Sequence, residues 1–514
     1  MQLTGGGLST MPMQAVTEPT GFPPCPAPFN MARYVLTAGE TTPNKIALQI
    51  LRASGAERWS YARLIAAVRG TGTGLLRAGL QPGDRVLMRL GNTVDFPVAY
   101  LGAIAVGLVP VPTSTQLTGP EITRMARALN PALVLAAGDV ARPDHPAPVL
   151  EQSALRAMQD LPPCDWHMGD PERAGYIIYT SGSGGSPRAV VHAHRAIWAR
   201  RMMWDGWYGL TADDRMLHAG AFNWTYTLGT GLMDPWAIGA TALIPEQGAP
   251  LRLMLKRFDA TIVAAVPGVY RQILKDSAAL ELPRLRHGLS AGEKLPDVTR
   301  DAWRAATGRE IYEALGMSEC STYVSASPAR PAPAGAAGYP QSGRRIAILD
   351  AQGQPVTRDE DGMLAIHRDD PGLMLGYLED GTAQLPLQGD WFLTGDRARM
   401  LDDGALRYIG RNDDMMNAGG FRVSPLEVER ALSEHPGILE IACAEVPVRE
   451  GVSVIGAFYT APAPIDEAEL QAFAETRLAR YKQPRLYRHL DALPRGANGK
   501  LSRRLLAGHI GDST

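Results

Sequence analysis

Residues 176–188 read Tyr-Ile-Ile-Tyr-Thr-Ser-Gly-Ser-Gly-Gly-Ser-Pro-Arg, and this stretch points to the fold of the chain around it. An apolar, β-rich segment from Gly175 to Tyr179 runs into residues that are nearly all small, hydroxylated or glycine. Small residues let successive backbone N–H groups converge on one point, and hydroxyl groups add donors. Arg188 adds a positive charge suited to phosphate oxygens. The stretch predicts an anion-binding loop, with a flexible Gly/Ser turn as the alternative, and it lacks the Gly-Lys-Ser/Thr ending of a Walker loop.

The composition is that of a globular protein with more than one core. At 514 residues the chain is too long for one ordinary core, so we expect two or more domains. It is 45% hydrophobic and 20% charged with a formal net charge of −2, which gives no reason to expect nucleic acid or a membrane surface as a partner. Only six residues are lysine, so a lysine in a glycine-rich loop stands out.

Targeting and redox signals point to a cytoplasmic protein. The N-terminus lacks a basic segment followed by an apolar one, so no signal peptide is expected. The longest apolar run, Val98 to Pro112, is short for a membrane span and reads as a buried helix passing into a strand. The four cysteines lie far apart without metal-ligand spacing, which fits reduced thiols in the cytosol. The oligomeric state cannot be read from these features.

The pattern along the chain predicts an α/β fold with a large N-terminal domain. From about residue 30 to 410, apolar β-like segments (85–90 and 132–137, for example) alternate with helical patterns (62–80 and 120–129). This alternation predicts several layers of helices and mostly parallel sheets. After a proline- and glycine-rich stretch, residues 345–349, 362–366 and 405–409 are predicted strands of a smaller β unit.

The chain is predicted to divide into a tail and two domains. Residues 1–27 are expected to be a disordered or loosely ordered tail, 28–412 a large domain, and 413–514 a small mobile α+β domain. Ser424, Pro425 and Glu427 form a helix start of capping-box type. Residues 441–446 and 452–459 are predicted strands, and 467–478 a predicted helix.

Three further segments carry chemistry at the ends of apolar runs. Residues 313–319 (Glu-Ala-Leu-Gly-Met-Ser-Glu) place a carboxylate after a hydroxyl behind a predicted glycine turn, an arrangement suited to Mg²⁺ near phosphates. Residues 391–396 (Trp-Phe-Leu-Thr-Gly-Asp) end in an acid that can accept hydrogen bonds from ribose hydroxyls. Residues 493–500 form a predicted mobile turn that carries Lys500. Taken singly, each also fits an ordinary helix cap, strand-end turn or surface hairpin.

Together with residues 410–414 (Gly-Arg-Asn-Asp-Asp), and in this order, these motifs resemble the adenylate-forming superfamily of acyl- and aryl-CoA synthetases, luciferases and adenylation domains. The resemblance covers roughly residues 30 to 505. The family's loop reads Tyr-Thr-Ser-Gly-Thr-Thr-Gly-x-Pro-Lys-Gly. The departures here are that Gly184 loses a hydroxyl, Arg188 replaces lysine and Ala189 replaces glycine.

The resemblance implies an ATP site with Mg²⁺. The loop residues would bind phosphate together with Arg188, Ser318 would contact the α-phosphate, and Glu319 would hold Mg²⁺. Asp396, assisted by Arg411, would hold the ribose. The remaining loop and adenine-binding residues implied are Thr180, Ser181, Gly182, Ser183, Ser290, Ala291, Gly292, Glu293, Glu313, Ala314, Leu315 and Gly316.

The resemblance also implies a reaction in two steps. Lys500 looks like the lysine that bridges the substrate carboxylate and the phosphate during adenylation. Asp413 sits at the family's hinge, about which the small domain turns. Gly419 and Gly420 resemble the loop that meets the pantetheine of coenzyme A, although Asn417 stands where lysine is frequent.

The acid-binding segment is similar to that of benzoate-CoA ligases between Trp224 and Ile244. The acid-lining residues implied are Trp224, Thr225, Tyr226, Val266, Pro267, Gly268, Thr322 and Tyr323. Trp224 and Tyr226 also fit ordinary core aromatics. A histidine is usual at the position of Thr322 in benzoate ligases, so substituted aromatic and short to medium aliphatic acids stay open.

The expected function is therefore an ATP-dependent acid–CoA ligase that adenylates an aromatic or short to medium-chain carboxylic acid and then transfers the acyl group to coenzyme A. Lys500, Glu319 and Arg188 are its expected catalytic residues. Two alternatives stay open: a stand-alone adenylation enzyme that loads a carrier-protein thiol, and a nucleotide-binding protein with degraded catalysis.

Overall fold

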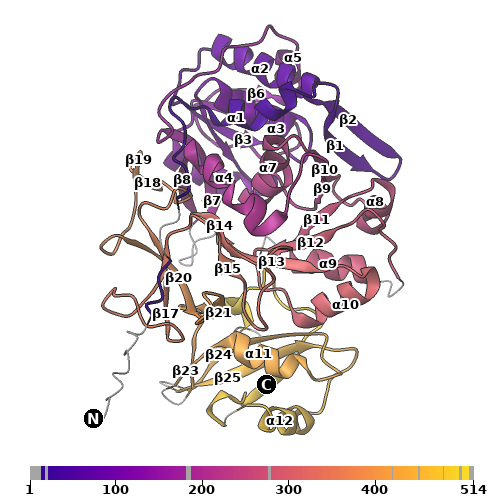
Figure 1. The fold of residues 1–514 in the computed structure, drawn as a ribbon, viewed down its shortest axis with the longest axis vertical. Coiled ribbons are helices and arrows are strands. Elements are labelled where there is room, and N and C mark those ends of the chain that lie inside the picture. The colour runs from indigo at the N-terminus through magenta and orange to yellow at the C-terminus, as the bar shows by residue number, and fades with distance from the viewer. Residues whose placement is uncertain are drawn as a thin grey trace, which may run out of the picture.

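The computed structural model describes residues 13–17, 21–180, 187–275, 279–418, 421–449, 452–478, 480–496, 500–506 and 508. They form a large α/β domain with a small domain at one end, which Figure 1 shows at the bottom in orange and yellow. This agrees with the predicted fold class. No helix among these residues is both long and apolar enough to cross a membrane.

Two mainly parallel sheets form the body of the large domain. The nine-stranded sheet has the order β15-β14-β13-β12-β11-β9-β10-β1-β2, and its five pairs from β13 to β1 are parallel. Its strands are β1 (Ile46–Arg52), β2 (Gly55–Ser60), β9 (Arg215–His218), β10 (Thr241–Pro245), β11 (Ile262–Ala265), β12 (His287–Ala291), β13 (Ile311–Met317), β14 (Ser321–Ser325) and β15 (Tyr339–Pro340). The second sheet is parallel throughout, in the order β4-β3-β5-β6, with β3 (Arg85–Arg89), β4 (Val109–Pro112), β5 (Leu133–Ala136) and β6 (Val149–Glu151).

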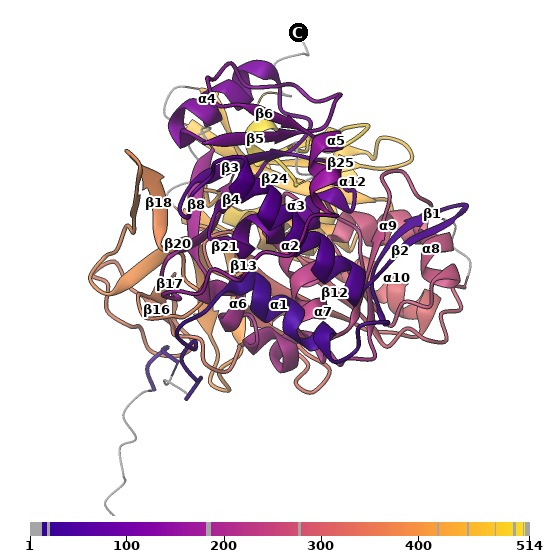
Figure 2. The same cartoon turned by 90° about the horizontal axis from the view of Figure 1, so that it is seen from above.

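The helices cover these sheets because each turns an apolar side toward them. The helices of the large domain are α1 (Met31–Glu40), α2 (Tyr61–Arg77), α3 (Asp95–Ala105), α4 (Gly119–Leu129), α5 (Gln152–Met158), α6 (Arg195–Ala199), α7 (Asp234–Ala237), α8 (Leu251–Arg257), α9 (Pro267–Leu274), α10 (Asp297–Thr307) and the π-helical η1 (Trp204–Tyr208) and η2 (Thr227–Met233). Figure 2 shows α1, α2 and α3 from above. α3 is buried along its whole length and leads to β4, as the apolar run Val98 to Pro112 predicts. Thr118 and Glu121 form a capping box that starts α4.

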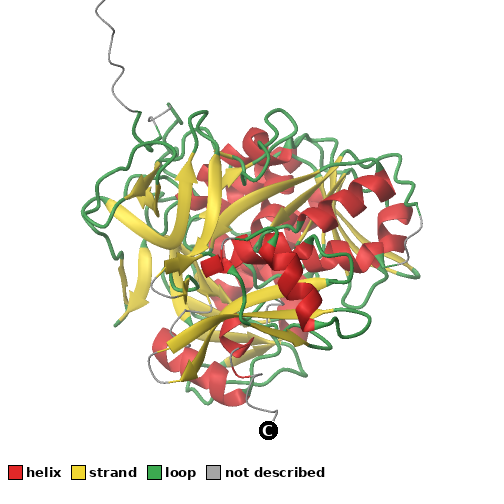
Figure 3. Ribbon diagram, turned by 90° about the horizontal axis from the view of Figure 1, so that it is seen from below, coloured by secondary structure: helices red, strands yellow, loops and turns green. Residues whose placement is uncertain are grey.

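Two antiparallel sheets complete the large domain. The loop-bearing strand β7 (Ala174–Thr180) pairs with β8 (Arg188–Ala193), which pairs with β18 (Gly376–Glu379) and then β19 (Thr382–Gln384). The predicted β unit has the order β16-β17-β20-β21, with β16 (Ile346–Leu349), β17 (Asp361–His367), β20 (Trp391–Met400) and β21 (Leu406–Arg411). Figure 3 shows these strands in yellow beside the helix-covered part of the domain.

Part of the predicted tail is packed against the β unit. Ala15 is fully buried, and its N–H donates to the carbonyl of Val356 at 2.8 Å. The N–H of Thr17 donates to the carbonyl of Ile346 at 2.9 Å. Residues 13–17 therefore extend the edge of this sheet, which differs from the loosely ordered tail expected from composition.

The small domain has its own core. Its elements are β22 (Met416–Ala418), β23 (Phe421–Val423), α11 (Pro425–Ser433), β24 (Glu440–Arg449), β25 (Val452–Thr460), α12 (Glu467–Glu475), η3 (Arg480–Lys482), β26 (Leu486–His489) and α13 (Arg503–Leu506). Val428 and Leu432 of α11 pack against Ile455 and Ala457 of β25. The helix start at Pro425 and the strand pair β24–β25 match the sequence prediction. The predicted capping by the Ser424 side chain is wrong, because its hydroxyl donates to the carbonyl of Ile409 instead.

Candidate active site

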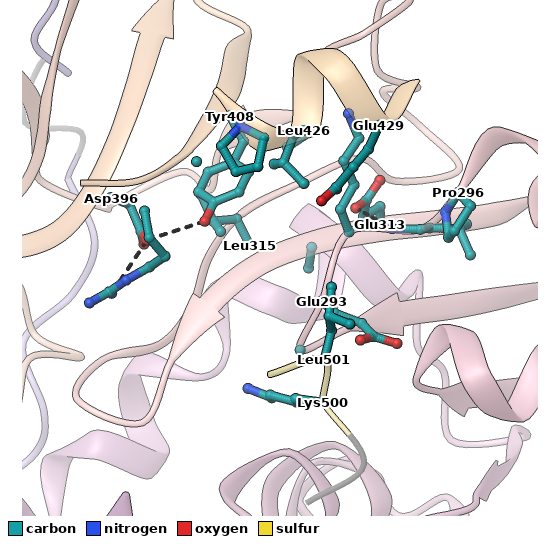
Figure 4. Close-up of a pocket in the computed structure, with 18 of the residues that line it drawn as sticks. Glu293, Pro296, Glu313, Leu315, Asp396, Tyr408, Leu426, Glu429, Lys500 and Leu501 are labelled. Atoms are coloured by element: carbon teal, nitrogen blue, oxygen red, sulfur yellow. Dashed lines mark hydrogen bonds and ion pairs between the residues drawn. The ribbon is translucent and has the colours of Figure 1, made fainter. Parts of the chain in front are cut away.

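A cavity of about 2200 Å³ lies between the two domains, at the carboxyl edge of the nine-stranded sheet. β9, β11, β12 and β13 run parallel and end at this edge, where ligands of open α/β sheets bind. The loop after β12 and the end of β13 line the cavity on one side, and residues near the end of the small domain line it on another. Figure 4 shows Asp396 and Tyr408 on one side of the cavity and Glu293 and Lys500 on another.

Arg188, Tyr377 and Glu319 form a connected group in the cavity wall. The guanidinium of Arg188 stacks 3.7 Å from the ring centroid of Tyr377, and its Nη2 donates to the tyrosine hydroxyl at 2.7 Å. That hydroxyl donates to Oε1 of Glu319, also at 2.7 Å. Burial beside the carboxylate holds the pKa of Tyr377 above its ordinary value, so the phenol keeps its proton. Glu319 is buried, and the hydrogen bond from the Tyr377 hydroxyl orients its carboxylate.

The donor set at Glu319 fits Mg²⁺ shared with a nucleotide. Magnesium usually takes one or two protein carboxylates and completes its shell with water and substrate phosphates. Among the described residues no group of three His, Cys, Asp or Glu side chains is arranged to hold a metal alone. Next to Glu319, the carbonyl of Ser318 is held by Nε2 of His192 at 2.7 Å. One carboxylate with room beside it suits a metal whose other ligands come with the substrate.

Asp396 lies on β20 opposite Arg411 on β21, because the two strands pair at these residues. Nη1 of Arg411 lies 3.5 Å from Oδ1 of Asp396, and the Tyr408 hydroxyl donates to the same oxygen at 3.4 Å. Burial raises the pKa of Asp396 to about 6, although Arg411 and Tyr408 act to lower it. Nε of Arg411 also donates to Asp413 at 3.0 Å. The ribose-binding and hinge candidates are thus joined through one guanidinium.

Lys500 reaches the large domain from the small one. Its Cε lies 3.8 Å from where a β-carbon on Gly292 would be, so the backbone of Gly292 leaves room for it. The side chain borders the open cavity and has protein on most other sides. This dehydration lowers the pKa of the Lys500 ammonium group, while Glu293, Asp396 and Glu319 act to raise it. A cation under the electrostatic influence of three carboxylates is placed where negative charge would gather on a bound substrate.

Ion pairs hold the two domains together beside Lys500. Glu440 of the small domain accepts from Arg271 of the large domain and from Arg495 of its own domain, each at 2.8 Å. Nη1 of Arg495 in turn lies 3.8 Å from Oε2 of Glu293. Burial raises the pKa of Glu293, and Arg495 and Arg271 act to lower it. These pairs keep the lysine-bearing segment against the loop after β12.

Glu313 fixes the segment that follows β12. One of its oxygens accepts from the N–H of Leu295 at 2.9 Å, and the other accepts from Arg300 at 3.0 Å. Burial raises the pKa of this carboxyl, and the Leu295 amide and Arg300 act to lower it. Glu313 belongs to β13, as does Gly316, so the predicted glycine turn is wrong: the segment is an extended strand up to Met317.

Most of the predicted nucleotide residues meet in this cavity. The predicted residues that line it are Thr180, Arg188, Gly292, Glu293, Glu313, Ala314, Leu315, Gly316, Ser318, Glu319, Asp396, Arg411, Asp413 and Lys500. Ser290 and Ala291 are buried within β12 instead. Ser181, Gly182, Ser183, Gly419 and Gly420 lie outside the described residues.

The predicted acid residues lie around the same edge but do not line this cavity: Trp224, Thr225, Tyr226, Val266, Pro267, Gly268, Thr322 and Tyr323. Val266 comes nearest, with Cγ1 3.6 Å from where a β-carbon on Gly292 would be. The Tyr226 hydroxyl donates to the carbonyl of Leu289 at 3.3 Å, so this ring crosses the face of β12. Tyr323 packs in the apolar core shared with the β unit.

Sequence reasoning missed Tyr377 and Tyr408. Both act on predicted residues through their hydroxyl groups, yet both lie in ordinary strand patterns with no polar motif around them. The sequence held a hint of a functional role only for Tyr408, which stands three residues before Arg411 on the same strand.

Comparison with known proteins agrees with this geometry. A family model described as "AMP-binding enzyme" matches residues 36–378, and a second, "AMP-binding enzyme C-terminal domain", matches residues 427–500. The chain belongs to the AMP-binding enzyme family. Both matched regions border the cavity of this family member. Glu319 lies in the first region, and Lys500 lies at the end of the second.

Relatives of this AMP-binding enzyme include ligases for aromatic acids. The chain is 30% identical to a 4-hydroxybenzoate–CoA/benzoate–CoA ligase of Rhodopseudomonas palustris, over 87% of this chain and 88% of that protein. It is 29% identical to the human mitochondrial acyl-coenzyme A synthetase ACSM2A, over 95% and 92%. The crystal structure of the anthranilate CoA ligase AuaEII in complex with anthranoyl-AMP superposes with a TM-score of 0.85 at 25% identity, over 94% of this chain and 98% of that one.

Proposed function

We propose that the protein is an ATP-dependent carboxylic acid–CoA ligase that acts on an aromatic acid. It adenylates the acid, releases pyrophosphate, transfers the acyl group to the thiol of coenzyme A and releases AMP. The observation that carries the proposal is the meeting of Lys500, Asp396, Glu319 and Arg188 around one cavity. The similarity to ligases of this class over most of the chain supports the same reaction. The free thiols of all four cysteines fit a reducing, cytoplasmic setting.

Positive charge is the main catalytic need of the first step, because a carboxylate attacks the negatively charged α-phosphate. At an effective dielectric of about 20, a cation about 4 Å away contributes about 4 kcal/mol, or about three decades of rate. In this proposal Lys500 lies between the carboxylate and the α-phosphate, and Arg188 faces the departing pyrophosphate. Mg²⁺ held by Glu319, when bound, supplies further charge to the phosphates.

The ribose and the base are held by the large domain. Ionised Asp396 accepts hydrogen bonds from the two ribose hydroxyls, and Arg411 keeps the carboxylate oriented. The adenine lies between the loop after β12 and the end of β13, where Gly292 and Gly316 line the cavity. The roles of Ser181, Gly182 and Ser183 at the phosphates, and of Gly419 and Gly420 toward coenzyme A, belong to the proposal as sequence-based expectations.

The second step needs Lys500 to leave. The ammonium group fills the approach to the reacting carbon, so the thiol enters only after the small domain turns about Asp413. The ion pair between Arg411 and Asp413 joins the hinge to the ribose site, and this turn breaks or moves it.

The test separates the two half-reactions. We expect pyrophosphate exchange with at least one aromatic acid, and AMP release on addition of coenzyme A. In Lys500→Ala, acid-dependent pyrophosphate exchange falls by about three decades, while thioester formation from a pre-made acyl-adenylate is retained. Equal loss of both half-reactions contradicts the assigned role of Lys500. A burst of acyl-adenylate without turnover on free coenzyme A selects a carrier-protein thiol as the acceptor, and no exchange with any acid contradicts the function.

A further inference from the structure

Two buried polar side chains near the predicted acid site have no hydrogen-bond partner among the residues that the structure describes. They are His218, of which neither ring nitrogen is bonded, and Thr227, whose hydroxyl is unbonded. Both are almost completely shielded from solvent, with 1% and 0% of their surface exposed. Buried polar groups in native proteins are nearly always bonded, and leaving one unpaired costs about 1–3 kcal/mol. Two such groups close together point to a partner that the described residues do not supply.

His218 and Thr227 converge on one point beside Gly220. A β-carbon on Gly220 would lie 2.3 Å from Oγ1 of Thr227 and 3.2 Å from Nδ1 of His218. Gly231 also packs closely against His218, since a β-carbon there would lie 2.9 Å from Cβ of His218. Glycine at both positions therefore lets the backbone pack closely against the two polar groups, which are neighbours at Gly220.

This point lies on the same face of the sheet as Tyr226. His218 is the last residue of β9, and its ring meets the ring of Tyr226 edge-on with centroids 4.5 Å apart. The neighbouring strands contribute to this face three small side chains, Ala264, Ala291 and Ala314, and the larger Leu289. A flat ligand entering from the carboxyl edge would find aromatic side chains on one side and small ones beneath.

The reach from the reaction centre to His218 suits one aromatic ring. Strand pairing places His218 level with Ala264 and Leu289. Gly292, where Lys500 enters, is three residues further along and two strands away, or about 10 Å along the strands and about 10 Å across them. Side chains reach into this interval from both ends, so a ring with a carboxylate on one side and a substituent on the other fits between them.

The charge state of the pair selects a neutral group. Burial lowers the pKa of His218 to about 3, with a smaller contribution from the charge of Arg200, so the imidazole is neutral at physiological pH. Arg200, the nearby cation, is engaged by Asp234, Tyr208 and Thr230. A neutral imidazole offers one donor and one acceptor, and a hydroxyl offers both. The pair can satisfy a hydroxyl or an amino group but offers no charge to a second carboxylate.

We propose that His218 and Thr227 recognise a hydroxyl or amino substituent on the ring of the aromatic acid. The protein is then a ligase for substituted rather than plain benzoic acids. This rests on the function proposed above and adds the chemical class of its substrate. Sites built to bond a polar substituent discriminate strongly against analogues that lack it, because their own buried groups are then left unpaired.

The experiment compares kcat/KM for AMP formation across benzoate, its hydroxy and amino derivatives, and a benzene dicarboxylate. We expect at least one hydroxy- or amino-substituted benzoate to have a kcat/KM at least tenfold higher than that of both benzoate and the dicarboxylate. His218→Phe keeps the edge-on contact with Tyr226 and removes both nitrogens, and Thr227→Val keeps the shape and removes the hydroxyl. Each variant is expected to reduce the preference for the substituted acid over benzoate by about tenfold, mainly through KM.

A matched control is His367→Phe, because His367 makes the same kind of edge-on contact with Trp391, with centroids 5.0 Å apart, on a strand of the β unit. It should leave the preference unchanged. A kcat/KM for benzoate equal to that of every substituted acid overturns the inference. A preference that persists in folded Thr227→Val and His218→Phe also overturns it, because the two polar groups would then bond a buried water and not the substrate. If no acid supports AMP formation, the proposed function itself fails, which is a separate outcome.

Discussion

At the scale of single residues, the orientation of Glu319 depends on a tyrosine hydroxyl. Tyr377 accepts from Arg188 and donates to Glu319, each at 2.7 Å, so one hydroxyl couples the cation of the loop strand to the predicted metal ligand. Hydrogen bonds to charged groups contribute about 1.5–3 kcal/mol. We therefore expect Tyr377→Phe to raise the Mg²⁺ concentration that gives half-maximal adenylation by about tenfold or more, measured by pyrophosphate exchange across a Mg²⁺ titration.

The matched control is Tyr487→Phe. The hydroxyl of Tyr487 is buried in the small domain and has no hydrogen-bond partner among the described residues. Its removal should leave the Mg²⁺ titration unchanged. If Tyr377→Phe and the control behave alike, the hydroxyl of Tyr377 does not position Glu319.

Asp396 gives the protein a pH dependence at the residue scale. Burial raises the pKa of Asp396 to about 6, so below that pH the carboxyl keeps its proton and no longer accepts both ribose hydrogen bonds. We expect nucleotide affinity, measured by calorimetry, to fall about tenfold per pH unit below about 6. The nucleotide phosphate titrates in the same range, so Asp396→Asn is the reference. A wild-type profile parallel to that of the variant would contradict the assignment.

The same group affects stability with the opposite sign. Without nucleotide, folded Asp396 keeps its proton up to about pH 6, whereas the unfolded chain loses it near the ordinary value of 3.8. The folded state binds more protons between these values, so stability falls as the pH rises through that window. Asp396→Asn should remove this part of the pH dependence in denaturant unfolding curves.

At the scale of elements, the close approach of β13 to β14 explains a glycine in a strand. A β-carbon on Gly316 would lie 2.6 Å from the carbonyl oxygen of Ser321 and 2.7 Å from Cα of Thr322. Both atoms belong to the backbone and cannot move aside cheaply. We expect Gly316→Ala to destabilise the protein by about 1–3 kcal/mol, measured by denaturant unfolding, and to reduce adenylation because the strand borders the cavity.

Gly119→Ala is the control for that change. Gly119 begins α4, and a β-carbon there would meet nothing within 4 Å. Alanine is the better helix former, so the control should be neutral or slightly stabilising. Equal effects of the two substitutions would show that β13 and β14 can separate without cost.

The elements were largely predictable from sequence because buried strands and amphipathic helices carry their own periodicity. Residues 132–137 are a continuous apolar run, and residues 85–90 are apolar apart from Arg85 and Arg89; they form β5 and β3. The prediction at Gly316 was wrong, because glycine in a sequence is read as a turn signal. The reason for glycine here is the close pairing of β13 with β14, which the sequence alone does not show. Tyr377 was missed for the same reason: its contacts with Arg188 and Glu319 span 189 and 58 residues of chain.

At the scale of the whole molecule, the site exists only when two domains meet. The large domain supplies Glu319, Asp396 and Arg188, and the small domain supplies Lys500. The ordered motifs of the sequence predicted this division of labour through the family resemblance. They did not predict the ion pairs that hold the domains in this arrangement, because Arg271, Glu293, Glu440 and Arg495 belong to four separate segments.

In the proposed reaction, those ion pairs should set the balance between the two half-reactions. Glu440 joins Arg271 across the domains and also holds Arg495, which lies near Glu293. The pairs stabilise the arrangement with Lys500 in the cavity, and the proposed turn of the small domain requires them to break. Removing the charge of Glu440 should therefore slow adenylation and leave thioester formation equal or faster.

We expect Glu440→Gln to lower the ratio of the adenylation rate to the thioester-forming rate several-fold at low ionic strength, measured by rapid quench for each half-reaction. Partly exposed charges are screened by salt, so the wild-type ratio should fall toward that of the variant as salt rises. Glu434→Gln is the matched control, because Glu434 pairs with Arg477 at 3.1 Å within the small domain alone. A ratio that responds to neither the substitution nor salt would mean that the small domain is held by its apolar contacts, and that the hinge at Asp413 turns without electrostatic restraint.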